Sequence, residues 1–292
     1  MVQTDGRAVA TIKPQPFVDV PRFSPDGRRL AFWAGPDLDR AVPWIAAADG
    51  RKARPLLPVP DGREPVTQSW GPPTWAPDGR RLAYVNDSAE PGSDSYHNTI
   101  HLIRVADGAR RALTLRASGG SAPPRSFSLL AWHGHRMLLA ATPHSFVVDV
   151  RTGAFVRIPG TAALSPGGDD VVYVRGGGLF VVDIVSRRRQ RLATADLEQA
   201  NLAWAPNGQW IAFVRRRAVY IVARTGGVPT KVAAGPASGA QWSPDGRSLL
   251  INEDRLSRTL TIVDVRLRAT RRIGLTGYVS GDWGWPMDWQ SG

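Results

Sequence analysis

Short apolar runs separated by tight turns recur along the whole chain. Four of the turns share one phrase, an aromatic residue followed by Ser or Ala, Pro, Asp or Asn, and Gly, at 23–27, 75–79, 204–208 and 242–246. Proline fixes one backbone angle of such a turn and glycine accepts the left-handed one. A strand-like apolar run follows each turn, at 30–33, 82–85, 211–214 and 249–251. The pattern predicts a β-hairpin that is repeated along the chain.

Two weaker copies complete the series. Leu164 begins a degenerate copy of the phrase, which precedes the apolar run 171–174. Trp132 precedes the apolar run 137–140. The six units therefore start at residues 23, 75, 132, 164, 204 and 242. The spacing is widest before Trp75 and Trp132, which indicates insertions in the loops there.

Each hairpin is followed by two further predicted strands. The third strands are apolar and lie at 42–45, 100–103, 146–148, 179–182, 219–222 and 260–263. The fourth strands mix apolar residues with arginine and proline, at 54–57, 111–115, 155–158, 191–193, 231–233 and 271–273. Such residues discourage pairing at an exposed sheet edge, so we expect the fourth strand on the outside and the second and third buried. Four antiparallel strands per unit is typical of a propeller blade.

The sequence thus predicts an all-β protein, a β-propeller of six four-stranded antiparallel blades forming one domain over residues 1–292. The expected blades are 17–60, 70–117, 127–160, 161–195, 199–235 and 238–276. The terminal segments 8–14 and 281–290 are expected to be strands at the ring closure. The alternative is a seventh, incomplete blade made from these two segments.

At the repeated phrase and the Ile-Ala-Phe-like strand behind it, the chain resembles the TolB-type propeller repeat, a WD-like family. The resemblance extends from about residue 17 to residue 272. It implies a protein- or peptide-binding scaffold located in the periplasm or otherwise outside the cytoplasmic membrane. Met1 is followed by no charged-then-apolar leader, and no apolar run is long enough to span a bilayer, so the sequence leaves the compartment open.

Charge adds a second candidate class of partner. The formal net charge is +12, and the only lysines are Lys13, Lys52 and Lys231. A basic chain can bind nucleic acid by releasing phosphate counterions. Here the arginines are dispersed, and the clusters 187–189 and 215–217 are expected at opposite ends of their strands. We therefore rank a solvated basic surface or an acidic protein partner above nucleic acid, which stays a second alternative.

Catalytic signatures are sparse. The chain has no cysteine, no Gly-x-Ser-x-Gly elbow, no hydrolase domain after the repeats and no phosphate-binding glycine loop. All five histidines fall in one third of the chain, at His97, His101, His133, His135 and His144. Their grouping supports an alternative function, a metal-dependent lyase or hydrolase acting on a carbohydrate. Because these histidines are expected at both ends of their blades, we predict no metal, no cofactor and no catalytic residue.

The insertions supply the candidate binding site. Three long connections, 58–69, 87–98 and 117–126, are expected on one rim of the propeller, and loops held by rigid strands often carry recognition residues. Our candidate contacts on or beside these loops are Trp70, Asp94, Tyr96, His97 and Arg125. The repeat tryptophans, and with them Trp33, Trp44 and Trp210, are assigned to packing. The sequence therefore predicts a monomer that binds a protein or peptide through this rim.

Overall fold

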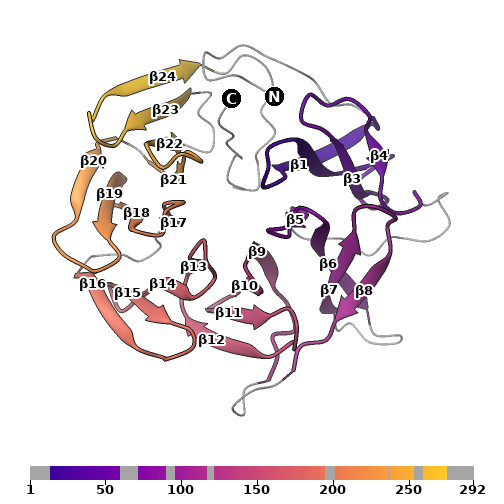
Figure 1. Ribbon diagram of the computed structural model, residues 1–292, viewed down its shortest axis with the longest axis horizontal. Coiled ribbons are helices and arrows are strands. Elements are labelled where there is room, and N and C mark those ends of the chain that lie inside the picture. Colours follow the sequence, from indigo (N-terminus) through magenta and orange to yellow (C-terminus); the bar gives the residue numbers. More distant parts are fainter. Residues whose placement is uncertain are drawn as a thin grey trace. The chain divides into compact units, whose positions relative to one another are not determined.

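The fold is all-β, a β-propeller made of six four-stranded blades. The computed structural model describes residues 14–59, 72–89, 96–116, 122–194, 201–235, 237–252 and 259–274. In these residues 24 strands form six antiparallel sheets, and neighbouring strands in every sheet are consecutive in the chain (Figure 1). The predicted class and blade number are confirmed. Nothing in the described ranges is a helix of the length and apolarity that crossing a membrane would require.

The chain divides into two compact units. The N-terminal unit comprises Val9–Thr142 and Phe146–Arg157, and the C-terminal unit comprises Met1–Ala8, Pro143–Ser145 and Ile158–Gly292. The terminal segments 8–14 and 281–290 lie outside the described residues apart from Pro14, so a seventh blade and the closure stay predictions. The single domain over 1–292 is likewise still a prediction.

Blades 1 to 3 belong mainly to the N-terminal unit. Blade 1 consists of β1 (Phe17–Phe23), β2 (Arg29–Gly35), β3 (Val42–Ala47) and β4 (Arg54–Pro55). Blade 2 consists of β5 (Thr74–Trp75), β6 (Arg81–Ala89), β7 (Tyr96–Arg104) and β8 (Arg110–Leu113). Blade 3 consists of β9 (Ser128–His133), β10 (Arg136–Ala141), β11 (His144–Asp149) and β12 (Phe155–Pro159).

Blades 4 to 6 form the C-terminal unit. Blade 4 consists of β13 (Ala162–Leu164), β14 (Asp170–Arg175), β15 (Gly178–Asp183) and β16 (Arg189–Thr194). Blade 5 consists of β17 (Leu202–Trp204), β18 (Trp210–Arg215), β19 (Ala218–Ala223) and β20 (Thr230–Ala233). Blade 6 consists of β21 (Gly239–Trp242), β22 (Ser248–Asn252), β23 (Thr259–Asp264) and β24 (Thr270–Gly274).

The core lies between neighbouring sheets because side chains alternate along each strand. On β6, Leu82 and Tyr84 belong to the apolar cluster shared with blade 1, whereas Ala83 and Val85 belong to the cluster shared with blade 3. The C-terminal unit repeats this arrangement, with Ile211 and Phe213 facing blade 4. Sheets buried on both faces explain why the second and third strands read as almost continuous apolar runs.

The residues of the repeated phrase shape the turn between the first two strands. In blade 1 the Ser24 backbone N–H donates to Arg29 O at 2.8 Å, and the Asp26 carboxylate accepts from the Arg28 N–H at 3.1 Å. Gly27 takes a φ of 70°, in the left-handed region. Blade 6 repeats the turn with Ser243 in place of Ser24. The carboxylates of the phrase are therefore occupied in holding turns.

Three of the four repeat tryptophans join their blade to the one before it. The indole N–H donates to a carbonyl on the preceding first strand, from Trp75 to Arg22 at 3.0 Å, from Trp204 to Ala163 at 3.0 Å and from Trp242 to Ala203 at 3.2 Å. Packing was expected of these side chains, and also of Trp33, Trp44 and Trp210. The first two of those are buried, but the prediction for Trp210 is wrong, because its side chain is 39% exposed at the start of β18.

Arginine side chains make a second set of contacts between neighbouring blades. The Arg29 guanidinium lies 5.1 Å from the ring centroid of Trp75 and donates to Gly79 O at 2.7 Å. Arg81 lies 5.3 Å from the ring centroid of Trp132 in the same manner. In the C-terminal unit Arg224 pairs with Asp170 at 2.6 Å. Some of the arginines that make the chain basic therefore stabilise the contacts between blades.

Candidate binding rim

The second blade is longer than the others at one edge. Its middle strands, β6 and β7, have nine residues each, whereas the middle strands of the other blades have five to seven. The extra pairs are Asp87 with Asn98, Ser88 with His97, and Ala89 with Tyr96. The insertion predicted as a loop over 87–98 is therefore partly a hairpin, and Tyr96 and His97 lie on β7.

Among the residues that the structure describes, no strand flanks the extension of this hairpin. The first strand β5 pairs with β6 only at Ala83 and Leu82, and β8 pairs with β7 only from Ile100 onward. Beyond these positions the two strands pair with each other alone. Within the described residues they form a two-stranded ribbon whose edges no strand covers.

A second insertion is attached to the base of this ribbon. The Asn98 backbone N–H donates to Arg125 O at 2.8 Å, and the Asn98 side-chain oxygen accepts from the Phe127 N–H at 3.2 Å. Phe127 is buried in the apolar cluster between blades 2 and 3, which fixes this segment. The Arg125 side chain is exposed, and none of the ion pairs among the described residues involves it. We call residues 86–89, 96–99 and 125–127 the blade 2 rim.

The structure thus brings three of the five candidate residues to one place. Arg125 is bonded to the residue that follows His97, and Tyr96 precedes His97 on β7. The side chains of Tyr96 and His97 are outside the described part of the structure, as are Trp70 and Asp94 entirely. Sequence reasoning missed Asn98, whose amide joins the two insertions, because a polar residue next to a predicted strand carries no signal for a distant loop.

The histidines are spread over their blades. His133 and His135 lie at the turn between β9 and β10, whereas His97 lies near the opposite end of β7 in blade 2. His135 is 3.6 Å from the Asp149 carboxylate. Among the residues that the structure describes, no three His, Cys, Asp or Glu side chains gather in a geometry that could hold a metal ion.

His101 has a packing role. Its ring stacks on Tyr84 with centroids 5.1 Å apart, and burial together with the nearby Arg110 lowers its pKa. The same cross-strand position pairs aromatic rings in three other blades, namely Phe32 with Trp44, Tyr173 with Phe180, and Phe213 with Tyr220. His101 therefore takes the place of an aromatic ring in a repeated row.

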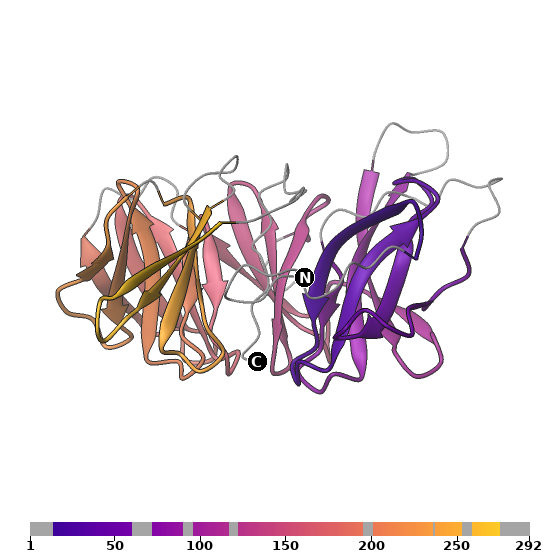
Figure 2. The same ribbon diagram turned by 90° about the horizontal axis from the view of Figure 1, so that it is seen from above.

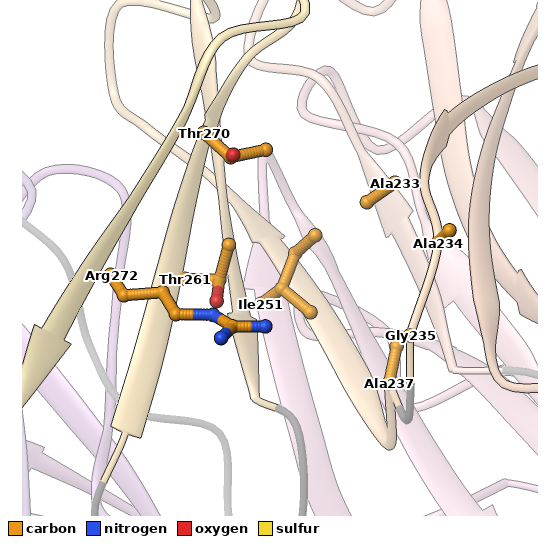
Figure 3. A pocket seen from close by; sticks show the side chains of 8 residues that line it. All are labelled: Ala233, Ala234, Gly235, Ala237, Ile251, Thr261, Thr270 and Arg272. Atoms are coloured by element: carbon orange, nitrogen blue, oxygen red, sulfur yellow. The ribbon is translucent and has the colours of Figure 1, made fainter.

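The C-terminal unit contains a small cleft. It lies between the end of β20 and blade 6 and is lined by Ala233, Ala234, Gly235, Ala237, Ile251, Thr261, Thr270 and Arg272 (Figure 3). Its volume is about 90 Å³, well below the several hundred Å³ of ordinary ligand pockets. The lining has one guanidinium, no carboxylate and no imidazole, so it offers no acid and base pair.

Comparison with known proteins supports the fold and leaves the activity open. No family model matches the chain. The solved structure of TolB from Acinetobacter baumannii aligns over 85% of this chain and 64% of its own, with a TM-score of 0.50 and 20% identity. A prolyl endopeptidase aligns over 88% of this chain and 42% of its own, with a TM-score of 0.61 and 14% identity.

One curated protein matches by sequence over a short region. It is described as the uncharacterized peptidase YuxL of Bacillus subtilis (strain 168), with 34% identity over 85 residues, which is 26% of this chain and 12% of that protein. The chain therefore spans about an eighth of the length of this curated protein. At the level of fold, the chain is a β-propeller of the TolB-like kind that the repeated phrase predicts.

Proposed function

We propose that the chain is a non-catalytic propeller that binds a protein or peptide segment through the blade 2 rim. The observation that carries the proposal is the ribbon of β6 and β7, which extends four residue pairs beyond the strands that flank it and is joined to the Arg125 loop through Asn98. Rigid strands hold this elaborated edge. The turn hydrogen bonds and the packing between blades account for the aromatic and acidic residues of the repeated phrase, so these residues supply no competing catalytic site.

The ribbon suggests how a peptide would bind. An extended chain can add to an uncovered strand edge through main-chain hydrogen bonds, and neighbouring side chains then supply specificity. Arg125 lies beside this edge with its guanidinium exposed. A planar guanidinium binds a carboxylate through two parallel hydrogen bonds, so an acidic, extended segment fits the rim best.

The test is capture of acidic peptides by the intact chain. An array of extended acidic peptides and their amide-substituted counterparts would be probed first, and Kd then measured for the strongest binder. We expect Arg125→Glu to weaken binding about tenfold or more, since it replaces attraction by repulsion. Arg175→Glu is the matched control, because Arg175 is likewise exposed but lies in blade 4, at the connection between β14 and β15, and outside the blade 2 rim.

A double variant, Tyr96→Ala with His97→Ala, tests the ribbon itself. Weaker capture with an unchanged melting temperature would support a contact role for these two positions. Unchanged capture in this variant and in Arg125→Glu would remove the rim from the proposal.

The peptidase similarity supports a second candidate, in which the propeller binds peptides beside a catalytic domain. The motivating observation is the sequence match to a protein described as a peptidase. The discriminating measurement is hydrolysis of the captured peptides by the chain alone and after addition of a peptidase. Cleavage that depends on the Arg125 side chain would favour this candidate over a plain scaffold.

A further inference from the structure

The three blades of the C-terminal unit each expose an aliphatic side chain at the same connection. Val185 is 73% exposed between β15 and β16, Val228 is 92% exposed between β19 and β20, and Leu267 is 78% exposed between β23 and β24. Single exposed aliphatic residues are ordinary on protein surfaces. What distinguishes these three is their shared position in consecutive blades.

The connections lie at one edge of the unit. Consecutive antiparallel strands place the first and third connections of a blade at the same end, and the first strands of blades 4, 5 and 6 pack against one another. Figure 1 shows the pairs β15–β16, β19–β20 and β23–β24 following one another along the outer side of this unit, and Figure 2 shows the unit from the side. Trp210 belongs to this edge too, because it pairs with Ala223 at the end of β19. We call the side chains of Val185, Val228 and Leu267 the aliphatic tips. The exposed side chain of Trp210 lies at the same edge as these tips.

Arginines surround these tips. The segments 183–189, 223–230 and 264–270 contain six arginines and two carboxylates. Both carboxylates are engaged in the turns, because Asp183 accepts from the Val185 and Ser186 N–H groups and Asp264 accepts from the Arg266 and Leu267 N–H groups. The first turns of the same blades add Asp169, Asp170, Asp245 and Arg247 to this end, and Arg224 pairs with Asp170. The edge keeps a net positive charge, carried by the exposed arginines at 187–189, 266 and 268.

Two of the turns share an unusual backbone. Arg187 and Arg268 occupy equivalent positions with φ of 59° and 53°, in the left-handed region that glycine and asparagine usually fill. The corresponding position in blades 1 to 3 is a glycine, namely Gly50, Gly108 and Gly153 with φ of 83°, 74° and 75°, and the blade 1 turn exposes no aliphatic tip. Arginine therefore replaces glycine at a left-handed position in two of the three turns that carry an exposed aliphatic residue.

We propose that this edge of the C-terminal unit docks on the surface of an anionic lipid bilayer. Aliphatic tips enter the boundary between headgroups and acyl chains, tryptophan favours the same depth, and arginines attract anionic headgroups. Separate protruding tips suit a fluid surface, whereas a protein interface prefers a continuous apolar centre and single-stranded nucleic acid prefers stacked aromatic platforms. This inference is independent of the peptide-binding rim.

The test is co-sedimentation of the full chain with vesicles at about 0.15 M salt, where long-range attraction is screened. We expect binding to vesicles of phosphatidylcholine with about 30% phosphatidylglycerol and little binding to phosphatidylcholine alone. The triple variant Val185→Ser, Val228→Ser and Leu267→Ser keeps the net charge and is expected to lower the partition coefficient about tenfold. Melting temperatures establish that each variant is folded.

A charge variant and its control complete the test. Arg187→Gly with Arg188→Gln removes two cations and relieves the positive φ, and it is expected to weaken vesicle binding about tenfold. Arg51→Gln with Lys52→Gly removes the same charge from the blade 1 turn that has no tip, and a clearly smaller effect is expected.

Three results would overturn the proposal. If the triple serine variant binds vesicles as well as the unmodified chain does, charge attraction alone accounts for the binding. An equal loss in the blade 1 control would mean that the edge has no special role. If the chain does not bind vesicles, the bilayer is excluded as the partner of this edge. This holds even if DNA, an acidic protein or a second copy of the chain binds there.

Discussion

His101 lies on β7 beside Tyr84, in a position that other blades fill with Trp44, Phe180 or Tyr220. From the sequence it counts as one of five grouped histidines and as a candidate metal ligand. Only the cross-strand register reveals that its ring takes part in a row of stacked aromatic side chains. The imidazole of His101 suggested metal binding, whereas its position in the sheet shows that the ring packs against Tyr84.

This role predicts a pH dependence of stability. Burial and Arg110 lower the pKa of His101 in the folded state, whereas the unfolded chain protonates it near pH 6.5. Because the unfolded state binds the proton more readily, the contribution of this residue to stability is present above pH 6.5 and falls as the pH drops below it. His101→Phe keeps an aromatic ring and removes the proton site.

We therefore expect the melting temperature of His101→Phe to exceed that of the unmodified chain more at pH 5.5 than at pH 8. His101→Ala is expected to cost about 1 kcal/mol at pH 8, since it removes the aromatic pair, and less at pH 5.5, where the contribution of His101 is smaller. Thermal unfolding across this range is the measurement. Parallel curves for the phenylalanine variant and the unmodified chain would contradict the assignment.

At the scale of the strands, the sequence predicts the blades well because each strand carries its own local signal. The apolar run of β18 and the turn at Asn207 and Gly208 are sufficient to locate the hairpin of β17 and β18. The length of β6 and β7 was not predicted, since the polar run from Asp87 to Asn98 resembles a loop. Its pairing depends on the register set by the apolar half of the same strands.

The candidate site was only partly predictable for a related reason. Arg125 and Asn98 lie on different connections, and their hydrogen bond depends on Phe127 packing between two blades. No period in the sequence encodes that approach. The cluster 187–189 was noticed only as charge, and the turn at Arg268 was not singled out, because the positive φ and the exposed aliphatic neighbours appear only in the structure.

The indole bonds between first strands give a prediction at the same scale. Trp204→Phe keeps most of the packing but removes the donor to Ala163 O, which should cost about 1–2 kcal/mol because a partly buried carbonyl loses its partner. Trp132→Phe is the matched control, since the buried indole nitrogen of Trp132 has no hydrogen-bond partner in the described residues. Urea unfolding of both variants measures the difference. Equal losses would show that the indole bond contributes nothing beyond ring volume.

Across the whole molecule, turn carboxylates recur as fixed acceptors. Asp26, Asp78, Asp107 and Asp245 all have a lowered pKa, with hydrogen bonds and neighbouring arginines contributing to each. The strongest case is Asp149, where the hydrogen bond from Arg151 is the main cause and the pKa is about 2. A carboxylate with a lowered folded pKa stabilises the fold above its unfolded value and loses that contribution as the pH falls through the folded one.

These groups lie in both units, so acid should weaken the fold at many turns together. We expect the melting temperature to fall steadily from about pH 4 to pH 2, with Asp149→Asn alone removing less than about 1 kcal/mol at pH 7 because Arg151 is largely exposed. Protonation also raises a net charge that is already +12 at pH 7, and the resulting repulsion opposes compactness. Added salt at pH 3 should therefore raise the melting temperature by screening that repulsion. If salt lowers it instead, the remaining ion pairs, such as Arg224 with Asp170, outweigh the net repulsion.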